Sequence, residues 1–344
     1  MPAAGIDVSD HSIRFVEFFH GSGKARLFRF GQKNIPDGVI SYGDIKDPEK
    51  LKAILSEFAR EQKLSFVRCA LPEEKAYVFK TDVPALNAQE TRDNIAFQLE
   101  ENVPLKAEDS IFDYVFLPKR DDGTSVSREV IVSVFPKSVI DQYYSLYKSA
   151  GLTPLSFEME ADAISRAVVP KNEHDCVMVV DFGRQRTGLS IVDRGVVEFA
   201  STVDVGGDIL THAIEKHFNV SFEEAEQIKH EETFVGHSEH KEFFASLMNS
   251  VSALADEMNK HFVYWHTHPD RKGRKSPRIE RIVLVGGDAN LGGIAEHLSL
   301  VLKTKVELGN VWVNALSLDD SIPEMPFAAS LSYAAAVGLA LRAL

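Results

Sequence analysis

Two short segments of the chain place an aspartate at the end of an apolar run and a hydroxyl residue five or six positions later. A tight turn whose successive backbone N–H groups face outward binds anions. Small and hydroxyl residues in such a turn let a phosphate approach closely. The residues that fit this role are Ser9 and Ser12 in the first segment, and Gly183 and Thr187 in the second.

The two aspartates, Asp7 and Asp181, would repel a phosphate unless a cation lay between them. Mg²⁺ keeps several of its waters and is commonly held by one or two carboxylates together with phosphate oxygens. We therefore predict that Asp7 and Asp181 bind Mg²⁺ through water, and that the two turns hold the phosphates of a nucleotide.

Two glycine pairs, Gly206-Gly207 and Gly286-Gly287, stand where an apolar strand gives way to a helix. Glycine there lets the backbone approach a flat ring or a sugar-phosphate closely. The sequence contains neither a G-x-x-x-x-G-K-[ST] loop nor a nucleophile elbow. The nucleotide would therefore be held by the hairpin turns and the glycine pairs.

The elements around these turns form an internal repeat. The segments AAGIDVSDHSIRFVEFFHGSG and VVDFGRQRTGLSIVDRGVVEF each read as strand, turn, strand and turn. Such a repeat predicts two related halves, each opening with a β-hairpin.

A distinct block at residues 73–152 separates the halves. The strand KAYVFKTDV is followed by a helix in which Ile95 and Leu99 share a face and which Pro104 ends. The strands SIFDYVFL and REVIVSVF and a second helix capped by Gly151 complete the block. This β-α-β-β-α order predicts an inserted subdomain.

The second half is predicted to be rich in helices. Ser221 and Glu224 form a capping-box pattern, and apolar residues recur at helical spacing from Leu247 to Phe262. The apolar stretch that begins at Pro326 is about fifteen residues long, shorter than the roughly twenty that a membrane span needs. We therefore expect a buried helix there.

The composition excludes several classes of function. The formal net charge of −13 argues against general nucleic-acid binding. Cys69 and Cys176 lie in apolar runs and are expected to be buried thiols without a disulfide framework. No signal peptide is expected. The histidines 261, 266 and 268 are interpreted as an exposed helix end, and the basic run at 271–281 as a solvated loop.

The order of the two hairpins, followed by LVGGDANLGG, resembles the superfamily that contains actin, the Hsp70 chaperones, sugar kinases and FtsA. The segments NIAFQLEENVPLKAEDSIFDYVFL, VDVGGDILTHAI, EEAEQIK and AAAVGLALRAL resemble the PilM family of type IV pilus assembly. The resemblance covers nearly the whole chain. It implies an α/β, actin-like (ribonuclease H-like) two-lobed ATPase fold with the inserted subdomain.

The resemblance also implies limits for the subdomains. These are 1–72 for the first part of subdomain 1A, 73–152 for the inserted subdomain 1C, 153–174 for a return to 1A, 175–211 for the first part of subdomain 2A, 212–276 for the helical subdomain 2B, 277–325 for the second part of 2A, and 326–344 for the C-terminal helix of 1A.

The implied ligands are ATP and Mg²⁺. In the first hairpin Asp7 matches the family pattern, Ser9 stands at the glycine position and Arg14 at the lysine position. The other matching residues are Asp181, Gly183 and Thr187 in the second hairpin, Gly206, Gly207 and Asp208 in the loop after it, Glu226 and Lys229 as ribose and adenine contacts, and Gly286, Gly287 and Asp288 in the adenosine loop.

Glu160 lies where the superfamily places a residue that orients the attacking water, with Glu158 as a competing candidate. A solvated glutamate at a helix start is the alternative interpretation. We expect tight nucleotide binding with slow or undetectable turnover.

The resemblance implies a cytoplasmic protein held at the inner membrane by its partner, the N-terminal tail of a PilN-like membrane protein, bound through side-chain anchors in a groove. Candidate groove residues are Asn94, Phe97 and Gln98. Two other interpretations stay open: an FtsA-like division or filament protein, and a small-molecule kinase of the same superfamily. The sequence shows no aspartate base of the kind that a kinase needs, and we expect the last segment to be a core helix and not an FtsA-like membrane helix.

Overall fold

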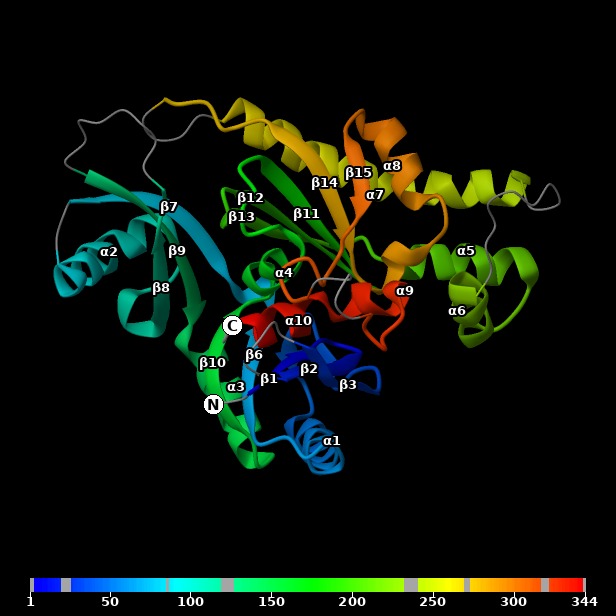
Figure 1. The fold of residues 1–344 in the computed structure, drawn as a ribbon, viewed down its shortest axis with the longest axis horizontal. Helices are drawn as coiled ribbons and strands as arrows, with labels where there is room; N and C mark the ends of the chain where they lie inside the picture. Colours follow the sequence, from blue (N-terminus) through cyan, green and yellow to red (C-terminus); the bar gives the residue numbers. More distant parts are fainter. Residues whose placement is uncertain are drawn as a thin grey trace.

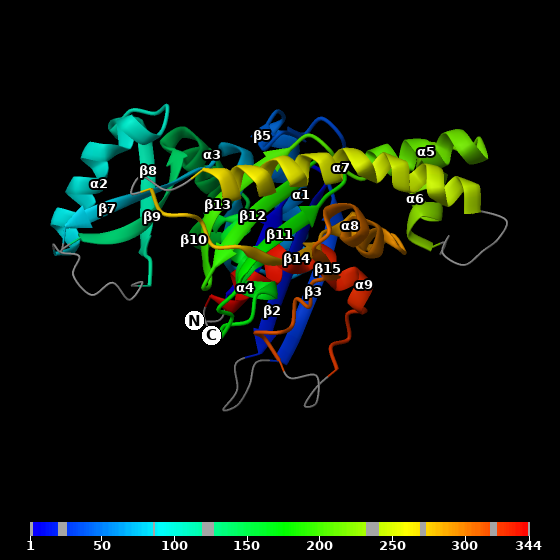
Figure 2. The same cartoon turned by 90° about the horizontal axis from the view of Figure 1, so that it is seen from above.

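A computed structural model describes residues 3–19, 26–84, 87–118, 127–231, 241–268, 273–316 and 322–342. Two β-sheets form its centre, and helices cover them (Figures 1 and 2).

The first sheet has the strand order β10-β6-β1-β2-β3. Strands β1 and β2 form the predicted antiparallel hairpin, and β6 and β10 add to β1 in parallel. The strands are β1 (Ala4–Val8), β2 (Ser12–Phe19), β3 (Arg26–Asn34), β6 (Phe66–Leu71) and β10 (Thr153–Met159). The helices of this lobe are α1 (Pro48–Glu61), α3 (Lys137–Ser149), α4 (Glu160–Val168) and α10 (Ala334–Leu341). A short pair, β4 (Ile40–Ser41) and β5 (Asp44–Ile45), lies between β3 and α1 in the chain.

The second sheet repeats the plan of the first, with the order β13-β12-β11-β14-β15. Again a hairpin is extended by two parallel strands. The strands are β11 (Cys176–Phe182), β12 (Thr187–Asp193), β13 (Val196–Val203), β14 (Ile279–Val285) and β15 (Lys305–Leu308). The helices are α5 (Asp208–Phe218), α6 (Phe222–Glu231), α7 (Lys241–Thr267) and α8 (Ile294–Leu302). The matching orders confirm the predicted internal repeat.

The inserted block has the predicted element order. Its sheet, in the order β7-β9-β8, and its helix project to one side of the two lobes (Figures 1 and 2). The elements are β7 (Tyr77–Pro84), α2 (Ala88–Asn102), β8 (Ser110–Phe116) and β9 (Ser127–Pro136). Ile95 and Leu99 of α2 are buried in a small separate core with valines of β7 and β9.

Helix α3 is predicted to belong to the inserted subdomain, but it packs with the first lobe. Its buried side chains, Tyr143, Leu146 and Tyr147, belong to the main core and not to the small core of the insert. The helix packs on α1 and β10 of the first lobe. The limits drawn between the subdomains stay a prediction, and this packing favours a limit near residue 136 for the part with its own core.

The C-terminal stretch is buried, as predicted, but it is divided. Helix α9 (Phe327–Ser330) and a single 3₁₀ turn precede α10. Every residue of α10 is buried, against α4 and β1 among other elements. Within the described ranges, no helix combines the length and the apolar character that crossing a membrane requires.

Three smaller expectations can be compared with the structure. Ser221 and Glu224 form the predicted capping box: each side chain accepts a hydrogen bond from the other's backbone N–H, at 3.2 and 3.0 Å. Cys69 and Cys176 are buried free thiols. The ring of His261 packs on Phe199, with the ring centroids 5.5 Å apart, so this histidine is part of a packed surface and not simply an exposed helix end.

Candidate functional site

A cavity of about 730 Å³ lies between the hairpin turns of the two sheets. The residues predicted from sequence that line it are Asp7, Ser9, Ser12, Arg14, Glu160, Asp181, Gly183, Glu226, Gly286, Gly287 and Asp288. The predicted residues that do not line it are Thr187, Gly206, Gly207, Asp208 and Lys229. The structure thus brings most of the predicted set to one place and puts the rest next to it.

The first turn is held by hydrogen bonds of its own. The backbone N–H of Ser9 donates to the carbonyl of Ser12 at 2.9 Å. Asp10, at the tip, accepts from the backbone N–H groups of Tyr42 and Gly43 at 2.8 and 3.1 Å. Among the residues described, Ser9 is not one with a positive φ. Serine at the family's glycine position therefore fits the backbone of this turn.

The first glycine pair, Gly206-Gly207, packs against the second turn and hydrogen-bonds to it. The backbone N–H of Gly183 donates to the carbonyl of Arg186 at 3.0 Å, and that of Gly207 donates to the carbonyl of Gly183 at 2.9 Å. A Cβ on Gly206 would lie 2.3 to 2.5 Å from backbone atoms of the turn, so this position needs glycine. Thr187 is fully buried, and its hydroxyl donates to the carbonyl of Val205 at 2.6 Å. That hydroxyl thus fixes the turn and does not face the cavity.

Carboxylates gather on the floor of the cavity. Burial raises the pKa of Asp7, against the lowering effect of Arg14, and burial with the charge of Asp7 raises the pKa of Asp181 to about 6. Burial also raises the pKa of Glu160, with the charges of Asp7 and Glu74 adding to it. A hydrogen bond with the Glu160 side chain lowers the pKa of Asp7 and so partly opposes the effect of burial. The floor is rich in negative charge, with Arg14 as a nearby cation.

This arrangement fits a hydrated divalent cation. Oδ1 of Asp7 is buried and has no hydrogen-bond partner within the described part of the chain. In the same part, no three carboxylate, histidine or cysteine side chains converge closely enough to hold a metal directly. Two separated carboxylates suit Mg²⁺, which keeps its waters.

The structure distinguishes the two glutamates near the start of α4. Glu158 points away from the cavity and pairs with Arg166 at 2.6 Å and with Arg342 at 3.4 Å. Glu160 is the first residue of α4 and lines the cavity. Glu160 is therefore the one placed to meet a ligand.

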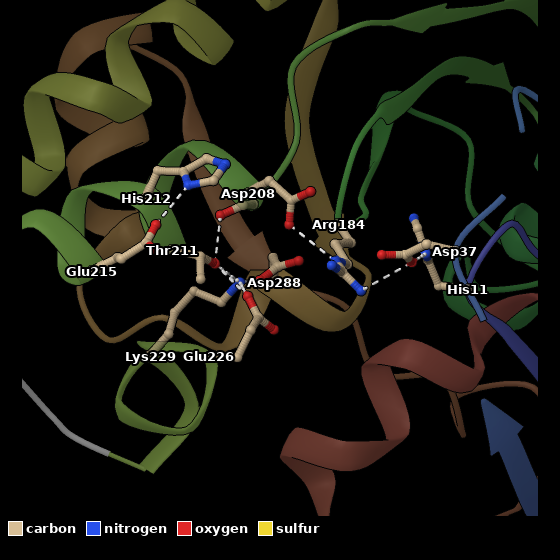
Figure 3. A network of polar contacts seen from close by, with 11 residues as sticks. His11, Asp37, Arg184, Asp208, Thr211, His212, Glu215, Glu226, Lys229 and Asp288 are labelled. Carbon is tan, nitrogen blue, oxygen red and sulfur yellow. Dashed lines mark hydrogen bonds and ion pairs between the residues drawn. The ribbon is translucent and has the colours of Figure 1, made fainter. Parts of the chain in front are cut away.

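The far end of the cavity is organised around a buried lysine (Figure 3). Nζ of Lys229 lies 2.6 Å from Glu226 Oε1, 2.5 Å from Asp288 Oδ1 and 2.8 Å from the Thr211 hydroxyl. A Cβ on Gly207 would lie 2.1 Å from the carboxyl carbon of Asp288. The lysine thus joins helix α6 to the loop after β14.

The comparisons with known proteins agree with this geometry. A profile of the family described as type IV pilus assembly protein PilM matches residues 5–344. The chain belongs to the PilM family. It is also similar to a chain of the solved PilM–PilN type IV pilus biogenesis complex, at 20% identity over 99% of this chain and 98% of that one, with a TM-score of 0.79.

More distant structures share the fold of this PilM-family chain. MreB5 of Spiroplasma citri bound to ADP is 14% identical over 91% of this chain and 93% of that one, with a TM-score of 0.54. Among curated proteins, the division protein FtsA of Staphylococcus epidermidis is 22% identical over 88% of this chain and 73% of its own length. The predicted α/β, actin-like two-lobed fold is confirmed.

The structure also shows cavity residues that sequence analysis did not identify in this PilM-family chain. Arg186 of the second turn reaches across to the first lobe, pairing with Asp10 at 2.7 Å and with Glu74. Arg184 pairs with Asp208 at 3.0 Å and lies 4.0 Å from Asp37 (Figure 3). Both arginines lie in the turn of the second hairpin. Their partners lie far away in the sequence, so the pairing could not be seen in the sequence alone.

Replacing Lys229 with methionine is expected to lower the free energy of unfolding by about 3 kcal/mol, because a buried cation is removed from between two carboxylates. Lys216→Met, on the exposed side of α5, is the matched control and should change stability little. The measurement is urea unfolding without ligand. Equal stability of the two variants would show that the Lys229 contacts contribute nothing.

Proposed function

We propose that this PilM-family chain binds ATP with Mg²⁺ in the cavity and, in a manner linked to ATP, docks the N-terminal tail of a PilN-like membrane protein. Hydrolysis would be slow or absent. The observation that carries the proposal is that hairpin turns from two related sheets face one cavity, with Asp7 and Asp181 on its floor and Glu226 at its far end. The solved relative bound to ADP supports a nucleotide as the ligand.

Each group in the cavity has a role in this proposal. The N–H groups of Ser9 and Gly183 donate within their own turns, so other backbone N–H groups of the two turns would bind the phosphates. Asp7 and Asp181 would hold the water shell of Mg²⁺, which neutralises phosphate charge when bound. Glu226 would contact the ribose, and Lys229, predicted as an adenine contact, does not line the cavity and would act by holding Glu226 in place. The second glycine pair would let the backbone approach the nucleoside.

Glu160 would orient water for hydrolysis, and its surroundings support slow turnover. Its pKa is raised by burial and by the neighbouring carboxylates. Burial among other carboxylates disfavours the ionised form of Glu160, which is the form that accepts a proton from an attacking water. Binding without rapid hydrolysis suits a scaffold.

The inserted subdomain is the proposed docking site, and the solved PilM–PilN complex supports a PilN-like partner. Among the three candidate residues on α2, Phe97 is 83% exposed. Gln98 bonds to the Thr81 hydroxyl and to Asn94, so these two are already engaged. Phe97 is therefore the better candidate for a side-chain anchor.

Ion pairs between the insert and the second lobe offer a route for the link to ATP. Lys80 of β7 pairs with Glu198 of β13 at 3.0 Å. Glu129 of β9 pairs with Arg274, which follows α7 in the chain. A change in the second lobe on nucleotide binding would reach the insert through these contacts. In this proposal the chain is held at the membrane by its partner alone.

Calorimetric titration tests the proposal. The protein is titrated with ATP with and without Mg²⁺, and then with a peptide of the cytoplasmic tail of the PilN-like protein from the same organism. We expect Mg²⁺-dependent nucleotide binding, and peptide binding whose affinity changes when MgATP is present. Phe97→Ala should weaken peptide binding, while Val115→Ala, at another exposed apolar position on β8, should not. If the protein bound neither ATP nor the peptide, the proposal would be overturned. If the protein sedimented with lipid vesicles when no partner was present, the FtsA-like alternative would be favoured.

A further inference from the structure

Glu73 is a buried acid that the proposed function leaves without a role. It follows β6, the strand next to β1 in the first sheet, and it lines the cavity. The residue is only 8% exposed, and its Oε1 has no hydrogen-bond partner in the part of the chain that the structure describes. A buried polar atom without a partner is costly, so its presence beside a cavity needs a reason.

The side chain of Glu73 belongs to the first lobe, and its carboxylate lies next to a strand of the second lobe. Gly188 of β12 is paired directly with Asp181 in the sheet. A Cβ on Gly188 would lie 3.7 Å from Glu73 Oε2 and 3.7 Å from the Cβ of Asp181. Glu73 therefore lies over the second hairpin, beside the predicted cation-binding aspartate, and glycine at 188 leaves room for it.

Other acids surround Glu73. Burial and the charges of Glu74, Asp181 and Asp162 raise its pKa, and a hydrogen bond from the backbone N–H of Ala161 lowers it. The next residue, Glu74, differs because Arg186 pairs with it. A carboxylate held among other carboxylates destabilises the empty protein and favours the binding of a cation.

We propose that Glu73 is a third carboxylate of the divalent-cation site, holding the water shell of the cation from the first lobe opposite Asp181 in the second. This inference rests on the proposed function. It adds that the cation joins the two lobes directly, and not only through the nucleotide. The contact would be made through water, because no three acids of the described residues converge closely enough to coordinate a metal directly.

The test is Glu73→Gln, which keeps the shape and removes the charge. Mn²⁺ or Mg²⁺ is titrated into protein saturated with a non-hydrolysable ATP analogue, and affinity for the analogue is measured separately in EDTA. We expect cation affinity to fall about tenfold or more, with analogue affinity in EDTA unchanged. We also expect the unfolding midpoint of the ligand-free protein not to fall, because glutamine keeps the size of the side chain and carries no charge that burial would disfavour. Glu49→Gln on the exposed face of α1 is the matched control and should change none of these.

The outcomes separate this inference from the proposed function. If the parent protein binds no cation with the analogue, the proposed function fails. If the parent protein and the Glu73→Gln variant bind the cation equally well, only this inference is overturned. A lower unfolding midpoint of the variant would then assign Glu73 a structural role. Should the glutamine variant not fold, Glu73→Asp keeps the charge on a shorter side chain. If the Glu73→Asp variant bound the cation as tightly as the parent protein, the inference would also be overturned.

Discussion

Replacing Asp181 with asparagine is expected to weaken the binding of Mg²⁺ with ATP by about 10- to 100-fold. The side chain lines the cavity at the end of β11, and its pKa of about 6 leaves it ionised at pH 7. Asparagine has nearly the same shape but lacks the charge that would hold the hydrated cation. Binding of ATP without Mg²⁺ should change far less, because the turn at Gly183 keeps its backbone donors. The measurement is calorimetric titration of ATP with Mg²⁺ and in EDTA.

Asp175→Asn is the matched control for this prediction. Asp175 precedes β11 in the same lobe and is exposed outside the cavity. Its replacement should leave both affinities unchanged. The assignment of the site would be wrong if Asp181→Asn bound MgATP as tightly as the parent protein, since Asp181 is the acid that both the sequence and the geometry place there.

The hairpins could be predicted because their signals are local. An aspartate at the end of an apolar run, followed by small residues and a second run, specifies strand, turn and strand within about twenty residues. Asp7 and Asp181 lie where that pattern placed them. The turn at Ser9 needs no glycine, which only the backbone angles could show.

The contacts across the cavity could not be predicted in the same way. Arg186 meets Asp10 and Glu74 only because the two lobes face each other. Glu73 and Glu74 did carry a signal, because they follow the apolar strand β6 as Asp7 ends β1. Parallel strands end at the same edge of a sheet, so the acids at their carboxyl ends become neighbours. Recognising this required knowing that β6 pairs with β1.

The assignment of α3 shows a similar limit. Its apolar positions predict a helix, and the helix is present. Which core receives Tyr143 and Tyr147 depends on contacts made at long range, and they enter the main core. Chain order alone placed α3 with the insert, because periodicity reports that a face is buried but not what covers it.

Replacing Gly338 with alanine is expected to destabilise the protein by about 3 kcal/mol or more, although the same change in an exposed helix would stabilise it by about 1 kcal/mol. Gly338 lies within α10, where that helix packs against α4. A Cβ at this position would lie 1.7 Å from the carbonyl oxygen of Ala163 and 2.4 Å from its carbonyl carbon. The two helices would have to move apart. The measurement is urea unfolding, in which the midpoint should fall clearly below that of the parent.

Because the clash is with backbone atoms, a second substitution tests its origin. Ala163→Gly removes a side chain from the facing helix but leaves its carbonyl in place, and glycine is itself unfavourable within a helix, so Gly338→Ala with Ala163→Gly should be no more stable than Gly338→Ala alone. Restored stability in the double variant would contradict the close backbone approach. Helix α10 also packs on β1, where a Cβ on Gly5 would lie 2.1 Å from the carbonyl oxygen of Ala336. Since β1 carries Asp7, displacement of α10 should also weaken MgATP binding, and the loss should follow the loss of stability.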